Sequence, residues 1–180
     1  MENHVPRDEK LSEFLQNQIL AIKMLCEGRL QLPILMLLYA TIDIVAFVRI
    51  GGSDKEAGPR FKEFVDTYII NQLPGITKDD LWGARCAILH TGTPESSSSI
   101  KGSAKEILYC WGKAKIELLD KIIAKNVDKY TAMSIEDFMG ALASGLDKFL
   151  EDMEKDQDLC KACLERVGKF YAHIPVKASK

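Results

Sequence analysis

Proline and glycine are scarce in this chain, with six and twelve occurrences in 180 residues. Because both residues interrupt helices, their scarcity leaves room for long helical segments. Neither sign of charge dominates, since 24 lysines and arginines stand against 26 acidic residues, for a formal net charge of -2. A basic surface over the whole chain is therefore excluded, and any site for a nucleic acid must be local.

The chain also lacks the usual features of a secreted or membrane-spanning protein. Its five cysteines are an odd number, and the first ten residues, MENHVPRDEK, do not have the basic-then-apolar order of a signal peptide. We therefore expect reduced thiols and a cytoplasmic location. The longest apolar run, residues 30–50, carries Asp43 in its middle and Arg49 near its end. These charges favour a buried core helix over a membrane span, so no membrane partner is expected.

Hydrophobic residues make up 47% of the sequence, enough for a single domain, 1–180, with a sizeable core. They recur at steps of three and four residues, which predicts helices over about 11–27, 33–49, 61–73, 134–153 and 159–171. One more helix is expected from Thr77, whose hydroxyl can cap its start, to Gly92, which can end it. The predicted fold class is an all-α helical bundle.

Two segments after this fourth helix have a different pattern. Residues 93–104, TPESSSSIKGSA, are small and polar, which predicts a flexible connector, with a lid over a neighbouring cleft as the alternative. Beyond them, Ile107, Tyr109 and Trp111 alternate with other residues before Gly112. That alternation favours a short β-hairpin over a helix, so the bundle is expected to carry a hairpin after its fourth helix.

The fourth helix contains the segment LWGARCAILHTG, residues 81–92, in which Arg85 precedes His90 by five positions. On a helix the two residues lie about 140° apart, too far for a tight salt bridge but close enough to share one flank. An imidazole exchanges protons near neutral pH, and a guanidinium can bind phosphate, so both side chains suit a cleft that acts on RNA. The alternative is a helix end at which His90 satisfies carbonyls and Arg85 extends to solvent.

Asp43 lies in the middle of the most apolar predicted helix. An unpaired carboxylate there would cost several kcal/mol, so a hydrogen-bond or charge partner is expected. We predict that the partner is Arg85 or His90, which would make Asp43 a supporting residue of the same site. The alternative is that Asp43 faces water or bonds another side chain.

The segment at 81–92, together with the apolar LLYATIDIVAF at 37–47, resembles the HEPN superfamily. The signature of that superfamily is an arginine followed four to six residues later by a histidine, and the resemblance covers roughly residues 11–110. It implies a HEPN-type helical bundle that dimerises so that two motifs meet in one groove. It also implies a metal-independent endoribonuclease without a cofactor, in which Arg85 and His90 are the catalytic pair.

The implied partners are RNA, a second copy of the chain and an antitoxin-like protein, in defence, toxin or RNA-processing roles. Two positions depart from the pattern: Cys86 follows the arginine where active members often have a polar residue, and Gly92 stands where one toxin branch has a tyrosine. Cys86 is therefore taken as a supporting residue beside Arg85. This cysteine and the acidic balance favour an alternative function, a non-catalytic HEPN-like bundle that binds nucleotide, RNA or a protein partner.

Three further patterns have two interpretations each. Cys160 and Cys163 form a single C-x-x-C without two further obvious ligands, which favours packing over a metal site. Trp82 and Trp111 suit the core better than base stacking. A cluster of lysines after the motif suits a solvated face or a phosphate track; it comprises Lys101, Lys105, Lys113 and Lys115.

Overall fold

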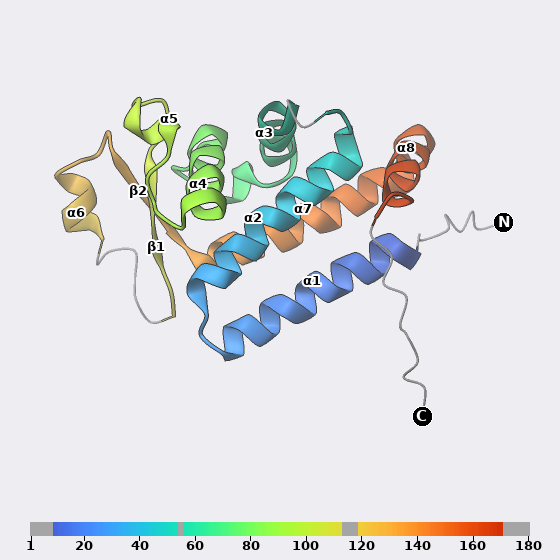
Figure 1. The fold of residues 1–180 in the computed structure, drawn as a ribbon, viewed down its shortest axis with the longest axis horizontal. Helices are drawn as coiled ribbons and strands as arrows, with labels where there is room; N and C mark the ends of the chain where they lie inside the picture. The colour runs from blue at the N-terminus through green and yellow to red at the C-terminus, as the bar shows by residue number, and fades with distance from the viewer. Residues whose placement is uncertain (1–8, 54–55, 113–118, 171–180) are drawn as a thin grey trace.

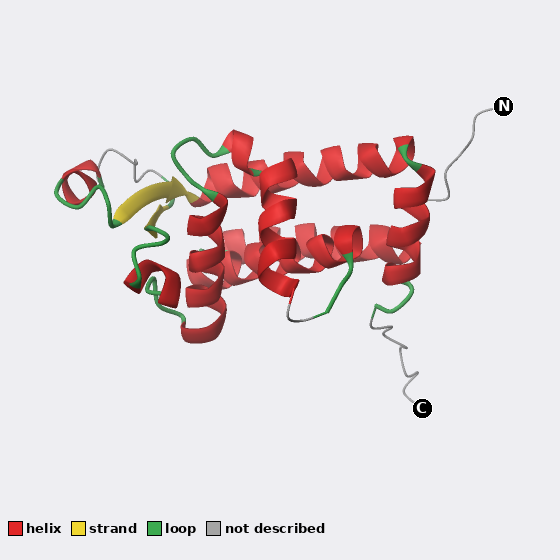
Figure 2. Ribbon diagram, turned by 90° about the horizontal axis from the view of Figure 1, so that it is seen from above, coloured by secondary structure: helices red, strands yellow, loops and turns green. Residues whose placement is uncertain are grey.

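The computed structural model describes residues 9–53, 56–112 and 119–170. Figures 1 and 2 show a predominantly helical molecule with a small sheet at one end, so the predicted all-α bundle is confirmed. The elements, in chain order, are α1 (Glu9–Glu27), α2 (Gln31–Ile50), α3 (Ala57–Tyr68), the 3-10 helix η2 (Ile70–Gln72), α4 (Lys78–Thr91), α5 (Ser97–Ile100), β1 (Glu106–Cys110), α6 (Asp120–Ala124), β2 (Tyr130–Ser134), α7 (Ile135–Lys155) and α8 (Gln157–Val167).

Helix α2 is the centre of the bundle, and it packs against α1, α3, α4, α7 and α8 (Figure 1). Ile34, Leu38, Ile42 and Val45 on this helix are fully buried, because the helix is apolar almost all round. By length and composition α2 would also suit a membrane span, but half of its most apolar stretch is buried inside the protein. This burial is what the core helix of a bundle shows.

Aromatic rings join α2, α3 and α7. Tyr39 on α2 lies 5.1 Å from Phe138 on α7, and Phe64 on α3 meets Phe149 on α7 edge to face at 5.8 Å, measured between ring centroids. All four rings are fully buried. Gly145 lets α7 approach α3 closely, since a Cβ at this position would lie 2.8 Å from the carbonyl oxygen of Tyr68.

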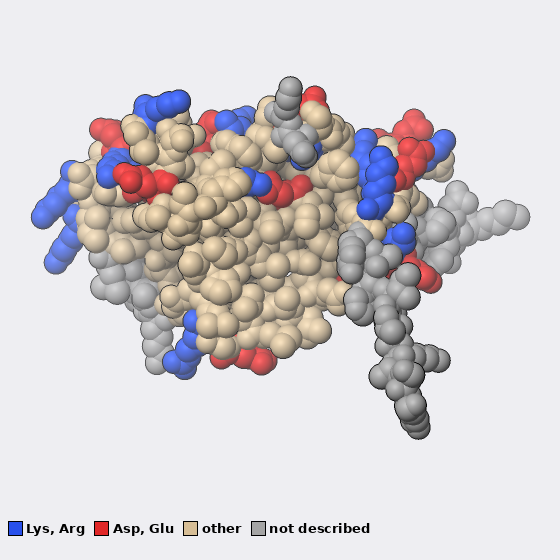
Figure 3. All heavy atoms as spheres, in the orientation of Figure 1, with Lys and Arg blue, Asp and Glu red and all other residues tan. Residues whose placement is uncertain are grey.

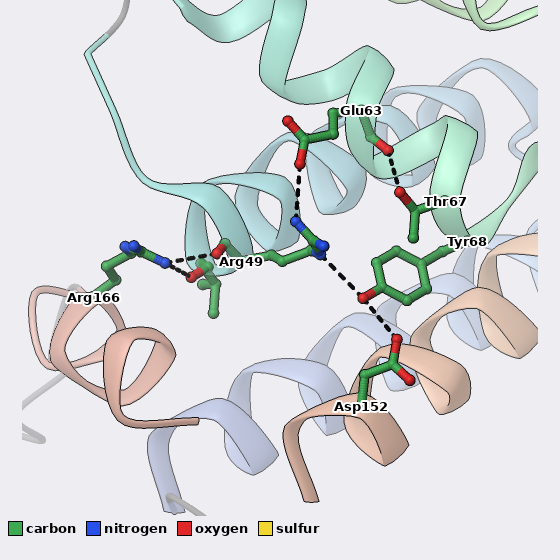
Figure 4. A network of polar contacts seen from close by, with 7 residues as sticks. Arg49, Glu63, Thr67, Tyr68, Asp152 and Arg166 are labelled. Carbon is green, nitrogen blue, oxygen red and sulfur yellow. Dashed lines mark hydrogen bonds and ion pairs between the residues drawn. The ribbon is translucent and has the colours of Figure 1, made fainter. Parts of the chain in front are cut away.

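A polar network crosses the same helices at the end of α2 (Figure 4). Arg49 donates from Nε to the Tyr68 hydroxyl at 3.0 Å and pairs with Glu63 at 3.1 Å. The Tyr68 hydroxyl donates in turn to Asp152 on α7, also at 3.0 Å. From α8, the Arg166 guanidinium donates to two carbonyls in the last turn of α2, at 2.7 Å each. The network closes a helix end whose carbonyls have no partner within the helix.

The helix that carries the Arg85 and His90 motif begins and ends where the sequence predicts. The Thr77 hydroxyl accepts from the Asp80 amide at 3.1 Å, and the Asp80 carboxylate accepts from the Thr77 amide at 2.9 Å, which is a capping box. Asp80 is buried and also accepts from the Lys105 amide at 2.5 Å, so it ties the start of α4 to the segment before β1. Gly92, at φ 65°, ends the helix in the left-handed region.

The prediction of a plain flexible connector over 93–104 is wrong, because part of it is a short helix, α5. Ser96 and Ser99 form a capping box there, in which each serine hydroxyl accepts from the backbone amide of the other. Serines can satisfy backbone groups in this way, which composition alone does not reveal. Ser96 is buried against Gly83, in the first half of α4. This contact does not place the segment over His90, which lies in the last turn of the same helix.

A small sheet follows α4, as expected, and β1 includes the alternating residues Ile107 and Tyr109. The partner strand is β2, and the two run parallel, with Glu106 opposite Tyr130 and Cys110 opposite Ser134. The connection is therefore a crossover that contains α6, and the prediction of a hairpin turn is wrong in this respect. Local alternation identifies a strand but carries no information about its partner. At the end of β2, the Ser134 side chain caps α7, which begins close to the predicted boundary at residue 134.

Candidate functional site

Asp43 and Arg85 face each other between the middle of α2 and the middle of α4. Arg85 donates to the Asp43 Oδ2 atom from Nε at 2.7 Å and from Nη2 at 2.5 Å. The Asp43 side chain is only 21% exposed and the Arg85 side chain only 16%, so the ion pair lies largely out of water. The expectation that Asp43 needs a partner on α4 is confirmed, and the partner is Arg85.

The same guanidinium reaches His90. The Arg85 Nη1 atom lies 3.0 Å from His90 Nε2. An arginine nitrogen only donates, so Nε2 accepts this bond and the ring proton lies on Nδ1. The two residues therefore touch directly, which the angle between their helix positions does not predict, because the long arginine side chain spans the gap. The helix-end alternative requires Arg85 to extend to solvent, and in the structure it does not. His90 is exposed.

Trp82 completes the surroundings of Arg85. The guanidinium carbon lies 5.2 Å from the centre of the Trp82 ring, a cation–π distance, and Trp82 packs in turn on buried Phe61 at 5.4 Å. Arg85 has five N–H donors, of which three are engaged by Asp43 and His90. The remaining N–H groups lie in the plane of the guanidinium, a group that can bind phosphate oxygens.

Cys86 is half-buried beside this group. Burial raises the pKa of its thiol, and the neighbouring Arg85 offsets part of that rise. At neutral pH the side chain is therefore the neutral thiol, a weak hydrogen-bond donor. Its place next to Arg85 fits a packing role better than a proton-transfer role.

Asp43 also lines a groove of about 720 Å³, which the sequence does not reveal. The groove lies between the first half of α1, the second half of α2 and the residues just after α8, segments that are distant in sequence. The periodic pattern assigns Phe14 to the apolar side of α1 but gives no sign that a hollow remains beside it. The lining residues are Lys10, Glu13, Phe14, Asn17, Gln18, Asp43, Ile44, Phe47, Lys169 and Phe170.

The remaining sequence candidates do not join this site. Trp111 is half-buried against the core. Lys101 and Lys105 precede β1, whereas Lys113 and Lys115 lie outside the described residues. Figure 3 shows basic side chains at the end of the molecule where α5 and α6 lie, with acidic side chains between them. Within the described ranges, no group of three or more His, Cys, Asp or Glu side chains is placed to hold a metal.

The C-x-x-C pair gives a testable prediction. Cys163 is fully buried, and burial raises the pKa of its thiol to about 11, from a usual value near 9. At pH 8 the native protein should therefore alkylate at Cys163 about 100-fold more slowly than the unfolded chain, as measured by mass spectrometry of iodoacetamide-treated peptides. The thiol favours the folded state fully below pH 9, and this contribution is lost as the pH rises to about 11. Half-exposed Cys86 serves as the internal control, and equal rates at Cys163 in both states would contradict the prediction.

Comparisons with protein families, with curated proteins and with solved structures found no match to this chain. The functional argument therefore depends on the geometry of Asp43, Arg85 and His90 and on the sequence pattern that contains them.

Proposed function

We propose that this chain is a metal-independent endoribonuclease of the HEPN type that acts as a dimer. The observation that carries the proposal is the chain of contacts from Asp43 through Arg85 to His90. It joins a phosphate-binding group to a group that can exchange protons, at an exposed helix end. The half-buried carboxylate fixes the orientation of the arginine, as a supporting residue does in many active sites.

These groups fit the requirements of RNA cleavage without a metal. A base removes the proton of a ribose 2'-hydroxyl, the 2'-oxygen bonds to phosphorus, the bond from phosphorus to the 5'-oxygen breaks, and an acid protonates that oxygen. Phosphate oxygens that accept from Arg85 Nη1 would compete with His90 for this donor. The released Nε2 lone pair would then be available to take the 2'-hydroxyl proton.

Among the described residues a single chain supplies one histidine at the site, whereas the reaction needs a base and an acid. A second copy would supply the other. Apolar exposure supports this part of the proposal, since five of the eight large exposed hydrophobic side chains in the described ranges lie on α1 or close to the turn into α2. They are Ile19, Leu20, Met24, Leu30 and Leu32, and we call them the hairpin patch. In Figure 3 the face over α1 and α2 carries few charged side chains at its centre, as a surface covered by a partner does.

The test of the proposed activity is cleavage of single-stranded RNA in excess EDTA. We expect shortened products with 2',3'-cyclic phosphate and 5'-hydroxyl ends, because no step above requires a metal. The ends are read by mass spectrometry and by direct 5'-labelling with a kinase, which a 5'-hydroxyl accepts without prior removal of a phosphate. A panel of structured and unstructured RNAs that stays intact would remove the ribonuclease proposal.

The dimer is tested separately. Light scattering at micromolar concentration should give twice the 20.2 kDa chain mass. Leu20→Arg should shift the protein to the monomer, because it places a charge in the hairpin patch at a side chain that is 57% exposed and therefore free to change without unfolding the chain. The matched control is Ile122→Arg on α6, where the side chain is 49% exposed and lies outside the patch. A wild-type protein that stays monomeric with and without RNA would contradict the composite site.

One observation favours a second candidate function. Three of the five Arg85 donors are already engaged, and His90 Nε2 has a partner, so most of the hydrogen bonds of the group are made without a substrate. A non-catalytic bundle that binds nucleotide, RNA or a protein partner would keep this arrangement for stability. Tight binding of RNA without any cleavage would favour this alternative.

A further inference from the structure

We propose that the groove beside Asp43 binds a purine base. Its volume of about 720 Å³ falls in the range of small-molecule sites, and its lining combines aromatic walls with a few polar groups. The part of this inference that concerns RNA rests on the ribonuclease function proposed above, whereas the part that concerns free nucleotides does not.

The walls of the groove suit a flat ring. Phe14, Phe47 and Phe170 line it, together with Ile44. Phe14 and Phe170 meet edge to face, at 5.4 Å between centroids and 65° between planes. Aromatic side chains bind bases by stacking. A two-ring purine covers more of this apolar surface than a one-ring pyrimidine, which favours the purine.

Two polar groups in the groove have unused hydrogen-bonding capacity. The two hydrogen bonds that Arg85 donates to Asp43 both go to Oδ2. Within the part of the chain that the structure describes, Asp43 Oδ1 accepts no hydrogen bond. The buried Thr41 hydroxyl shares its one proton between the Leu37 carbonyl at 2.8 Å and the Gln18 side-chain oxygen at 3.2 Å. This contact holds the Gln18 amide in place, and at least one N–H of the amide remains as a donor. Purines present an adjacent donor and acceptor on one edge, which these two groups match.

A ligand that carries phosphate would find a positive charge beside the groove. Arg85 neutralises Asp43 at the edge of the groove, and Lys169 lies among the lining residues. Asp43 belongs to both the groove and the ion pair, so a base bound in the groove lies next to the Arg85 guanidinium. A nucleotide bound in this way would set which RNA linkage is presented to Arg85 and His90.

The first experiment measures binding of free nucleotides to the full chain by isothermal titration calorimetry. AMP and GMP should bind more tightly than CMP and UMP, and ribose 5-phosphate should not bind detectably. Gln18→Leu should weaken purine binding about two- to tenfold, through loss of one hydrogen bond. Gln16→Leu is the matched control, since Gln16 lies on α1 outside the groove lining. Ile44→Trp should fill the groove and abolish binding, and circular dichroism checks that each variant folds.

The second experiment separates RNA from a free nucleotide as the source of the base. It measures binding of oligouridine with and without one purine, using wild type and Ile44→Trp. A purine-containing RNA that binds more tightly, with the advantage lost in Ile44→Trp, assigns the base to RNA. Binding of AMP or GMP without that advantage assigns it to a free nucleotide.

The inference is overturned if no purine ligand binds, or if Ile44→Trp binds purines as tightly as the wild type. The outcome is independent of the ribonuclease test. A protein that cuts RNA but binds no purine keeps the proposed function and loses the groove site. A protein that binds purines in the groove but cuts no RNA keeps the groove site and loses the proposed function.

Discussion

Replacing His90 with alanine is expected to lower RNA cleavage by about 10²- to 10⁴-fold, the usual contribution of a general acid or base. The reason is that Nε2 of His90 is a proton acceptor in direct contact with Arg85, whereas the Asp43 carboxylate is already engaged in the ion pair. The measurement is the initial rate of cleavage of a fluorescent single-stranded RNA in EDTA, at saturating protein.

The control for this substitution lies on the same helix. Lys78→Ala removes an exposed ion pair with Asp66 in the first turn of α4, far from the motif, and should leave the rate unchanged. Thermal unfolding of both variants shows whether a lower rate reflects a loss of structure. A His90→Ala protein that cuts as fast as the wild type would exclude His90 from the chemistry.

Arg85→Lys is expected to lower cleavage by about 10²- to 10³-fold, comparable to the loss of one donor that stabilises transition-state charge. The positive charge is kept, but a single ammonium cannot donate to Asp43 and His90 while it holds two phosphate oxygens. Arg29→Lys is the matched control, at an exposed residue in the turn before α2. Equal losses in both variants, or full activity in Arg85→Lys, would show that the planar guanidinium is not required.

The sequence predicts the environment of these residues better than their contacts. The cap at Thr77 and the end at Gly92 follow from local chemistry, because each is decided by a few neighbouring residues. A partner for Asp43 follows from the cost of burying a charge. The contact between Arg85 and His90 does not follow, since the angle between two helix positions ignores the reach of a long side chain.

The sequence does not predict features that are formed by segments distant from one another in the chain. The β1 strand is recognisable from its alternation, but its parallel partner lies beyond α6, and nothing local specifies that pairing. The groove has the same origin, since Phe14, Asp43 and Phe170 come from three separate parts of the chain. Helix periodicity assigns each residue to a side of its own helix and says nothing about the space left between helices.

The central place of α2 has a consequence for the nascent chain during translation. Asp43, Arg85 and His90 all belong to the first half of the sequence, so they leave the ribosome before α7 and α8 exist. The surface of α2 that supports them is covered by those two helices, through contacts such as Tyr39 with Phe138 and the Arg166 bonds to the end of α2. A nascent chain from which α7 and α8 have not yet emerged therefore holds these three residues without the scaffold that orients them. An activity directed at RNA would then begin only after both helices have emerged and folded.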